Sequence, residues 1–201
     1  MVTSSEATVS EAHQPFARPR VVPDDGDDAA IVARCLAGDV QAFGTLVERY
    51  QRVLYNLGLR MLGNPEDARD ASQTAFLKAW EKLSSFDPRF RFFSWIYKIT
   101  VNECLNQINR RRRVEPLDPR IDLPSRENAA ASLEARETSE RVQRALLQLT
   151  PDHREVVILR HFLEMSYGEI AGTLTIAEKT VKSRLYEARQ RLCELLPEKA
   201  A

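Results

Sequence analysis

Apolar residues recur at steps of three and four along three stretches of the chain: 29–84, 95–112 and 133–196. This spacing places the apolar side chains on one face of a helix. No stretch shows the strict alternation of apolar and polar residues that is typical of a half-buried strand. The pattern therefore predicts that the ordered part of the chain is helical throughout.

Turn-forming residues divide 29–84 into shorter helices. A Gly-Asp pair at 38–39 marks one break, and the Gly-Asn-Pro triplet at 63–65 marks a clearer one. Asn64 can cap the helix that follows, with the proline at its first position and two acidic residues in its first turn. We predict that this helix runs to about Leu83.

A further helix is predicted after a loop at 84–93 that contains a proline. Ser94 is placed to cap a helix from Trp95 to about Arg112. Six aromatic residues of the loop and the helix start are interleaved with cations, and we expect Trp95 and one or two of the phenylalanines to be buried. The polar face of the helix carries Lys98, Asn102, Asn106, Asn109 and Arg113.

Two segments lack a helical pattern. Residues 1–26 are rich in Ser, Glu, Ala and Pro, which predicts a disordered tail, and 114–133 combine three prolines with many charges, which predicts a linker. They delimit two domains, 27–113 and 134–197. The predicted fold is all-α, with two small helical domains joined by a flexible linker.

The second domain has the pattern of a helix-turn-helix. A helix over 141–149 is stopped by a Thr-Pro pair, which starts the next helix. Ser166 caps a short helix, with a glutamate at the capping-box position. A tight turn over 175–178 leads into a long helix from Lys179. Such a second helix can enter a major groove, although an ordinary helical hairpin with a charged outer face fits the same pattern.

The outer face of this long helix carries side chains suited to DNA. Early residues of the helix would meet base edges, and its arginines could reach phosphates. From the pattern alone, the candidates are Lys179, Lys182, Ser183, Tyr186, Arg184 and Arg189.

Formal net charge is zero over the 201 residues, so total charge says nothing about partners, but its distribution does. Between 89 and 113 there are seven basic residues and one acidic residue. Arg89, Arg91 and Lys98 lie among aromatic rings, an arrangement that suits single-stranded DNA. The run Arg110, Arg111, Arg112 and Arg113 can complement a helix dipole, and it can also grip phosphates.

The remaining composition restricts the class of protein. Three cysteines are far apart, so no zinc site is indicated, and we expect each to be a buried reduced thiol of a cytoplasmic protein. No apolar run approaches the roughly 20 residues that span a bilayer. His153 and His161 have no accompanying base, nucleophile or phosphate loop, so an enzyme is not indicated, and no cofactor is expected.

Particular residues resemble those of the extracytoplasmic-function group of bacterial sigma factors, in two regions that occur in the expected order. The resemblance covers roughly 27–196 without the linker. The fourth conserved region is matched by Leu149-Thr150-Pro151, Arg154, Leu159, Ser166-Tyr167, Glu169-Ile170-Ala171 and Thr180-Val181-Lys182-Ser183-Arg184-Leu185. The second region is matched by Asp67-Ala68, Asp70, Gln73, Phe76, Ala79-Trp80, Phe90, Trp95-Ile96, Asn102 and the arginines.

This resemblance implies a sigma factor that directs promoter-specific initiation, in response to stress or to the envelope, and does no bond chemistry itself. Its first domain would dock on core RNA polymerase and open the −10 element, and its second would read the −35 element. The implied partners are the β′ clamp and β flap of polymerase, promoter DNA and an anti-sigma factor. The alternatives are a stand-alone helix-turn-helix regulator and a helical adaptor that only scaffolds proteins.

The resemblance also assigns residues to surfaces. Polymerase would contact one helix face formed by Asp67, Asp70, Gln73 and Thr74, where relatives usually carry Glu in place of Thr74. The −10 strand would meet Arg89, Phe90, Arg91, Lys98, Asn102, Asn106, Arg110, Arg111, Arg112 and Arg113. The −35 duplex would meet Lys179, Thr180, Lys182, Ser183, Arg184, Tyr186, Glu187 and Arg189, of which Glu187 departs from the arginine common in relatives.

Overall fold

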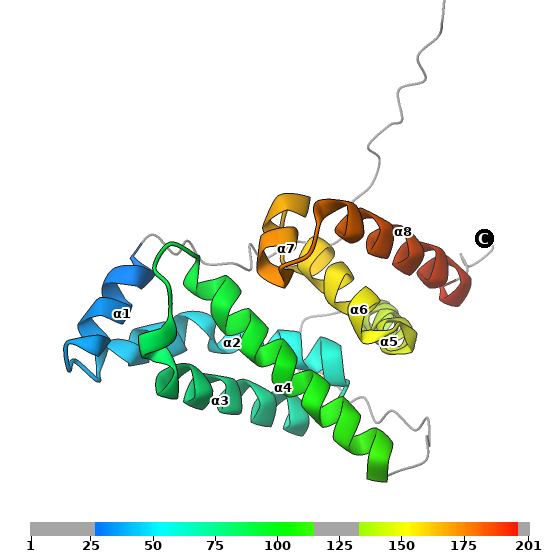
Figure 1. The fold of residues 1–201 in the computed structure, drawn as a ribbon. Coiled ribbons are helices and arrows are strands. Elements are labelled where there is room, and N and C mark those ends of the chain that lie inside the picture. Colours follow the sequence, from blue (N-terminus) through cyan, green and yellow to red (C-terminus); the bar gives the residue numbers. More distant parts are fainter. Residues whose placement is uncertain (1–26, 115–132, 197–201) are drawn as a thin grey trace, which may run out of the picture.

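The computed structural model describes residues 27–114 and 133–196, and every regular element within these two ranges is helical (Figure 1). The prediction of an all-α fold is confirmed. The predicted tail at 1–26, nearly all of the predicted linker and residue 197 lie outside the described residues. None of the described helices is both long and apolar enough to cross a membrane.

The first domain consists of four helices and one short 3-10 turn. They are α1 (Asp28–Leu36), α2 (Ala42–Leu62), α3 (Pro65–Glu81), η1 (Leu83–Ser85) and α4 (Phe92–Val114). Gly63 ends α2 in the left-handed region at φ 76°. The Asn64 side chain accepts hydrogen bonds from the backbone N–H groups of Glu66 and Asp67, at 2.9 and 3.1 Å. The predicted break and cap are therefore confirmed.

Helix α4 begins at Phe92, so the prediction that Ser94 caps it was wrong. The reason is tertiary packing. The rings of Phe92 and Phe93 are buried, with centroids 5.8 and 5.9 Å from that of Tyr50 on α2. Burying both rings in the core brings their backbone into the first turn of α4, where sequence reasoning expected a loop.

The expected burial of aromatic rings is only partly confirmed. Phe86, Phe92 and Phe93 are buried, whereas Trp95 is half-buried and Phe90 is 66% exposed. Trp95 packs beside Phe86, with ring centroids 5.5 Å apart, at the edge of the core. The prediction was wrong for Trp95 because its side chain packs at the edge of the core and not inside it.

The second domain contains the other helices. They are α5 (Leu133–Gln148), α6 (Pro151–Val157), the π-helical turn η2 (Ile158–Phe162), α7 (Tyr167–Leu174) and α8 (Glu178–Leu195). Helix α5 begins eight residues before the predicted start at 141. The capping box is confirmed: the Ser166 Oγ accepts from the Glu169 N–H, and the Glu169 carboxylate accepts from the Ser166 N–H. Thr175, at φ 58°, ends α7 and opens the turn into α8.

The two domains pack against each other. Helices α5 and α6 contact α2, and α7 contacts α4, so buried side chains form one continuous core. Leu57 and Ile96 represent the first domain in this core, and Leu146 and Leu159 the second. Helix α8 lies outermost, beyond α6 and α7 as seen from the first domain (Figure 1).

The three cysteines carry free thiols but differ in burial. Cys35 and Cys104 are buried as predicted, and burial raises the pKa of the Cys104 thiol to about 12. Cys193 is exposed near the end of α8, so the prediction of a buried thiol was wrong there. Its position among polar neighbours on the outer turn explains the difference.

Candidate functional site

Helix α3 separates a packing face from an outer face. Its packing face is lined by small residues, Ala68, Ala71, Ala75 and Ala79, all with no exposed surface. Such side chains let helices approach closely, and the α2 residue Gly58 lies directly against Ala68. The close packing fixes the direction of the opposite face, which carries the candidate residues of this helix.

The four candidates on α3 point outward to different degrees. Asp70 and Gln73 are exposed, while Asp67 and Thr74 are half-buried. Asp67 lies in the first turn, where a carboxylate complements the helix dipole, and it also forms an ion pair with Arg111 of α4. The predicted shared face is present, although one of its carboxylates is paired within the chain.

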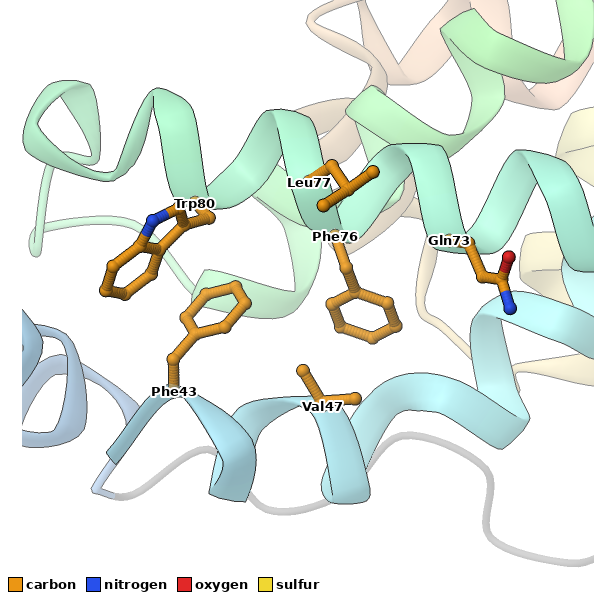
Figure 2. A pocket seen from close by; sticks show the side chains of 6 residues that line it. All are labelled: Phe43, Val47, Gln73, Phe76, Leu77 and Trp80. Carbon is orange, nitrogen blue, oxygen red and sulfur yellow. The ribbon is translucent and has the colours of Figure 1, made fainter. Parts of the chain in front are cut away.

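An apolar groove extends this face toward the end of α3. It has a volume of about 470 Å³ and is lined by Phe43 and Val47 of α2 together with Gln73, Phe76, Leu77 and Trp80 of α3 (Figure 2). The Phe43 and Trp80 rings meet edge to face, with centroids 5.1 Å apart. Leu77 is 65% exposed and Trp80 is 38% exposed.

Sequence reasoning missed this groove. Leu77 and Trp80 follow Gln73 at steps of four and three, which places all three on the same helix face. That spacing could have revealed an apolar continuation of the polar face. Exposed apolar side chains gathered around a groove are typical of a protein-binding surface.

The candidate residues around the start of α4 divide into two sets. Phe90 and Arg89 are exposed. Arg89 forms a 2.5 Å ion pair with Asp87, and the hydrogen bonds that Arg89 donates lower the pKa of the Asp87 carboxyl group. Arg91 and Lys98 instead face the second domain. The Arg91 guanidinium lies 3.2 Å from the Glu169 carboxylate, and the Lys98 ammonium donates to the Thr175 hydroxyl.

The rest of α4 carries the remaining candidates of this surface. Asn102, Asn106 and Arg110 are exposed on the helix. Arg111 pairs with Asp67, so the structure brings together two residues that the sequence assigned to different surfaces. The side chains of Arg112 and Arg113 lie outside the described residues, although α4 includes their backbone.

Helices α7 and α8 form the predicted helix-turn-helix. Val181, Leu185 and Ala188 are buried against α6 and α7, which turns the opposite side of α8 to solvent. That side exposes most of the predicted DNA-facing residues, and Thr180 at its edge is half-buried. The exposed residues are Lys179, Lys182, Ser183, Tyr186, Glu187 and Arg189.

Several of these side chains have partners on the protein. Lys182 pairs with Glu178 at 3.0 Å, and the Glu187 carboxylate lies 3.2 Å from Nε2 of His153. Tyr186 is 65% exposed. Helix α8 therefore presents a polar face of mixed charge, on which neighbouring side chains hold Lys182 and Glu187 in place.

Arg184 faces the protein more than the solvent. Its guanidinium is 2.6 Å from Asp152 and 3.9 Å from Glu155, both on α6, and its side chain is 25% exposed. Burial, reinforced by the nearby charge of Asp152, raises the pKa of Glu155 to about 7, while Arg184 opposes the rise. Sequence reasoning assigned Arg184 to phosphate contact and missed this brace between α6 and α8.

The described residues contain no group of three or more His, Cys, Asp or Glu side chains that could hold a metal ion. What they offer is an acidic and apolar face on α2 and α3, a cationic and aromatic region at the start of α4, and the outer face of α8.

Family models match both halves of the chain: Sigma-70 region 2 over residues 46–114 and Sigma-70 region 4 over residues 139–192. Curated relatives match across both. The ECF RNA polymerase sigma factor SigW of Bacillus subtilis (strain 168) is 32% identical over 169 residues, covering 77% of this chain and 89% of its own. This chain belongs to the ECF RNA polymerase sigma factors. The sigma factor SigM of Mycobacterium tuberculosis H37Rv is 37% identical over 169 residues, covering 84% of each chain.

Two solved structures share this fold. CnrH, in complex with the cytosolic domain of CnrY, has a TM-score of 0.65 at 29% identity, covering 86% of this chain and 99% of its own. RpoE of Bartonella quintana, in complex with the anti-sigma factor NepR, has a TM-score of 0.65 at 26% identity and covers 78% and 98%.

Membership explains what the surfaces have in common. Sigma factors are transcription initiation factors that bind core RNA polymerase and promoter DNA. The alternative of a stand-alone helix-turn-helix regulator leaves the region 2 match unexplained, and the chain is a sigma factor in both halves. An adaptor that only scaffolds proteins is excluded for the same reason.

Proposed function

We propose that the outer face of α3 and the adjoining groove form the surface that docks on core polymerase. The observation that carries this proposal is the exposed apolar stripe of Leu77 and Trp80, which continues the polar stripe of Asp70 and Gln73. An apolar centre with an acidic rim suits a helical partner whose own apolar face is bordered by cations. The β′ clamp would be that partner, and the region 4 domain would meet the β flap.

The −10 element is assigned to the first domain, taken as residues 27–113. Phe90 is exposed beside Arg89, so a flipped base can stack on the ring while a phosphate meets the cation. Asn102 and Asn106 offer hydrogen bonds farther along α4. Arg110 to Arg113 would bind phosphates and add affinity with little discrimination between bases.

The −35 element is assigned to α8 in the second domain, taken as residues 134–197. Lys182 and Ser183 are exposed at its start, where a recognition helix meets base edges, and Tyr186 can pack against a thymine methyl. Arg184 holds α8 on α6 through Asp152, so its contribution to DNA binding is the orientation of the helix.

Three further features belong to this proposal. The chain acts without catalysis of its own, as other sigma factors do, and works in the cytoplasm with polymerase. An anti-sigma factor is proposed as a regulator because the similar RpoE structure is a complex with the anti-sigma factor NepR. Release from that regulator would couple the chain to a stress or envelope signal.

Replacing Leu77 by Asp tests the docking surface. The new carboxylate would have to be desolvated on docking, so we expect at least a tenfold loss of affinity for core polymerase in a pull-down titration. Leu36→Asp is the matched control, because Leu36 is 55% exposed on α1 and does not line the groove. Equal binding by the two variants, each with unchanged circular dichroism, would refute the docking surface.

A further inference from the structure

Two adjacent residues of α6 form ion pairs with α8, which lies beside it (Figure 1). Asp152 pairs with Arg184 at 2.6 Å, and Nε2 of His153 lies 3.2 Å from the Glu187 carboxylate. Arg184 and Glu187 are one turn apart, so they lie on the same side of α8. Sliding the helices by one position would set the Asp152 and Glu187 carboxylates against each other. The two pairs therefore fix how α8 is placed on α6.

The pair of His153 with Glu187 has one fixed member and one exposed member. The His153 side chain is 24% exposed, and its backbone N–H donates to the Thr150 hydroxyl that caps α6. The Glu187 side chain is 60% exposed. Because the imidazole is held by its own helix, it restricts the rotamers of the glutamate. A contact from Glu187 to a ligand then costs less conformational entropy.

Glu187 lies at one edge of the outer face of α8. Ser183 is one turn before it on the same side of the helix. Lys182 lies at the opposite edge, where its ammonium is 5.7 Å from the centre of the Tyr167 ring on α7. The edge beside α7 is thus cationic and can meet a phosphate. The edge beside α6 carries a carboxylate and needs a hydrogen-bond donor on its ligand.

The major groove offers such a donor on cytosine. Its N4 amino group donates to carboxylates, whereas adenine presents its amino group beside the N7 acceptor, which repels them. An ionised carboxylate accepts hydrogen bonds on both oxygens, so a bond from His153 to one oxygen leaves the other available. The same bond offsets part of the repulsion between Glu187 and the phosphates.

We propose that His153 is a positioning residue for base reading. It holds one oxygen of Glu187, and the other oxygen accepts a hydrogen bond from the amino group of one cytosine in the −35 duplex. Helix α6, which precedes the helix-turn-helix, then contributes to sequence specificity without touching a base. The inference rests on the proposed assignment of α8 to the −35 element.

Transcription by the full-length protein with core polymerase, from promoters randomised in the −35 element, tests this inference. We expect the wild-type protein to prefer cytosine about tenfold at one position. His153→Leu removes the donor and should reduce this preference below about threefold, with other positions unchanged. His153→Gln keeps an N–H donor and should restore most of the preference. His161→Leu, the same substitution at an exposed histidine of η2, is the matched control and should have no effect.

A double variant separates positioning from a structural role. If His153 acts through Glu187, adding His153→Leu to Glu187→Ala should change nothing further at the cytosine position. A loss of preference that persists in the Glu187→Ala background would overturn the inference. So would an unchanged preference in His153→Leu, although an effect of Glu187→Ala would then still support α8 as the reader. If neither variant alters preference within the −35 element, the assignment of α8 fails together with the inference.

A modified promoter gives an independent measurement. Replacing the preferred cytosine by 2-pyrimidinone removes the amino group and weakens the base pair equally for every protein variant. The wild-type holoenzyme should therefore lose about fivefold more affinity than the His153→Leu holoenzyme, whose contact is already weakened. Equal losses by the two holoenzymes would rule out the amino group as the donor to Glu187.

Discussion

Glu155 gives the stability of this protein a defined dependence on pH. Its side chain is 12% exposed on α6. The charged groups around it are Asp152 on the same helix and Arg184 on α8 at 3.9 Å. The Tyr97 phenol on α4 is a neutral neighbour, because burial raises its pKa well above the usual value. Burial is the largest effect, and it raises the pKa of the carboxyl group from 4.5 to about 7.

The size of the effect follows from the two pKa values. At about 1.4 kcal/mol per pKa unit, a rise from 4.5 to about 7 corresponds to ~3 kcal/mol. Between these pH values the folded state holds a proton that the unfolded state has lost, so the free energy of unfolding falls as pH rises. Below pH 4.5 the stabilisation is complete, and above about pH 7 it is lost.

Glu155→Gln should remove this dependence, because the amide has nearly the same shape and does not ionise. We expect urea unfolding to show the variant ~2–3 kcal/mol more stable than the wild-type protein at pH 8, with the difference falling to ~1 kcal/mol at pH 5. The control is Glu194→Gln, whose carboxylate is 64% exposed on α8. A variant that keeps the wild-type slope between pH 5 and pH 8 would refute the role of Glu155.

Two further predictions concern DNA. Changing Arg110 to Arg113 to Ala should lower promoter affinity for all sequences alike and flatten its dependence on salt in fluorescence anisotropy, because fewer counterions are released; altered promoter preference at an unchanged salt slope would contradict phosphate binding. Glu187→Arg removes a carboxylate oriented by His153 and should raise general DNA affinity while altering preference only within the −35 element. Transcription from a library randomised in both elements measures this, and a shift confined to the −10 element would exclude α8 as its reader.

Local chemistry in the sequence predicted the helix ends well. Asn64 and the Ser166–Glu169 pair act within three or four residues, so their spacing alone indicated the caps that the structure contains. The start of α4 could not be found in this way, because Phe92 and Phe93 belong to the helix only through their packing against Tyr50, more than forty positions away in the chain.

The candidate surfaces were predicted unevenly for a similar reason. Helical periodicity placed Asp70, Gln73 and the outer face of α8 correctly with respect to solvent. It could not show that Phe43 of α2 meets Trp80 of α3, which is what makes a groove of an exposed stripe. Nor could it show that Arg184 faces carboxylates, since those belong to another helix.

Gln143 and Arg154 of the second domain donate hydrogen bonds to the last backbone carbonyls of α2, so this part of the contact between the domains does not depend on the side chains of the first domain. Gln143 and Arg154 recognise carbonyl groups of the backbone, which every helix ending in the same geometry presents whatever its side chains. A chimera that joins this region 4 domain to the region 2 domain of another sigma factor would keep that part of the contact. Exchange of promoter specificity between such proteins can therefore proceed by recombination of whole domains, without a matching set of side chains having to be rebuilt.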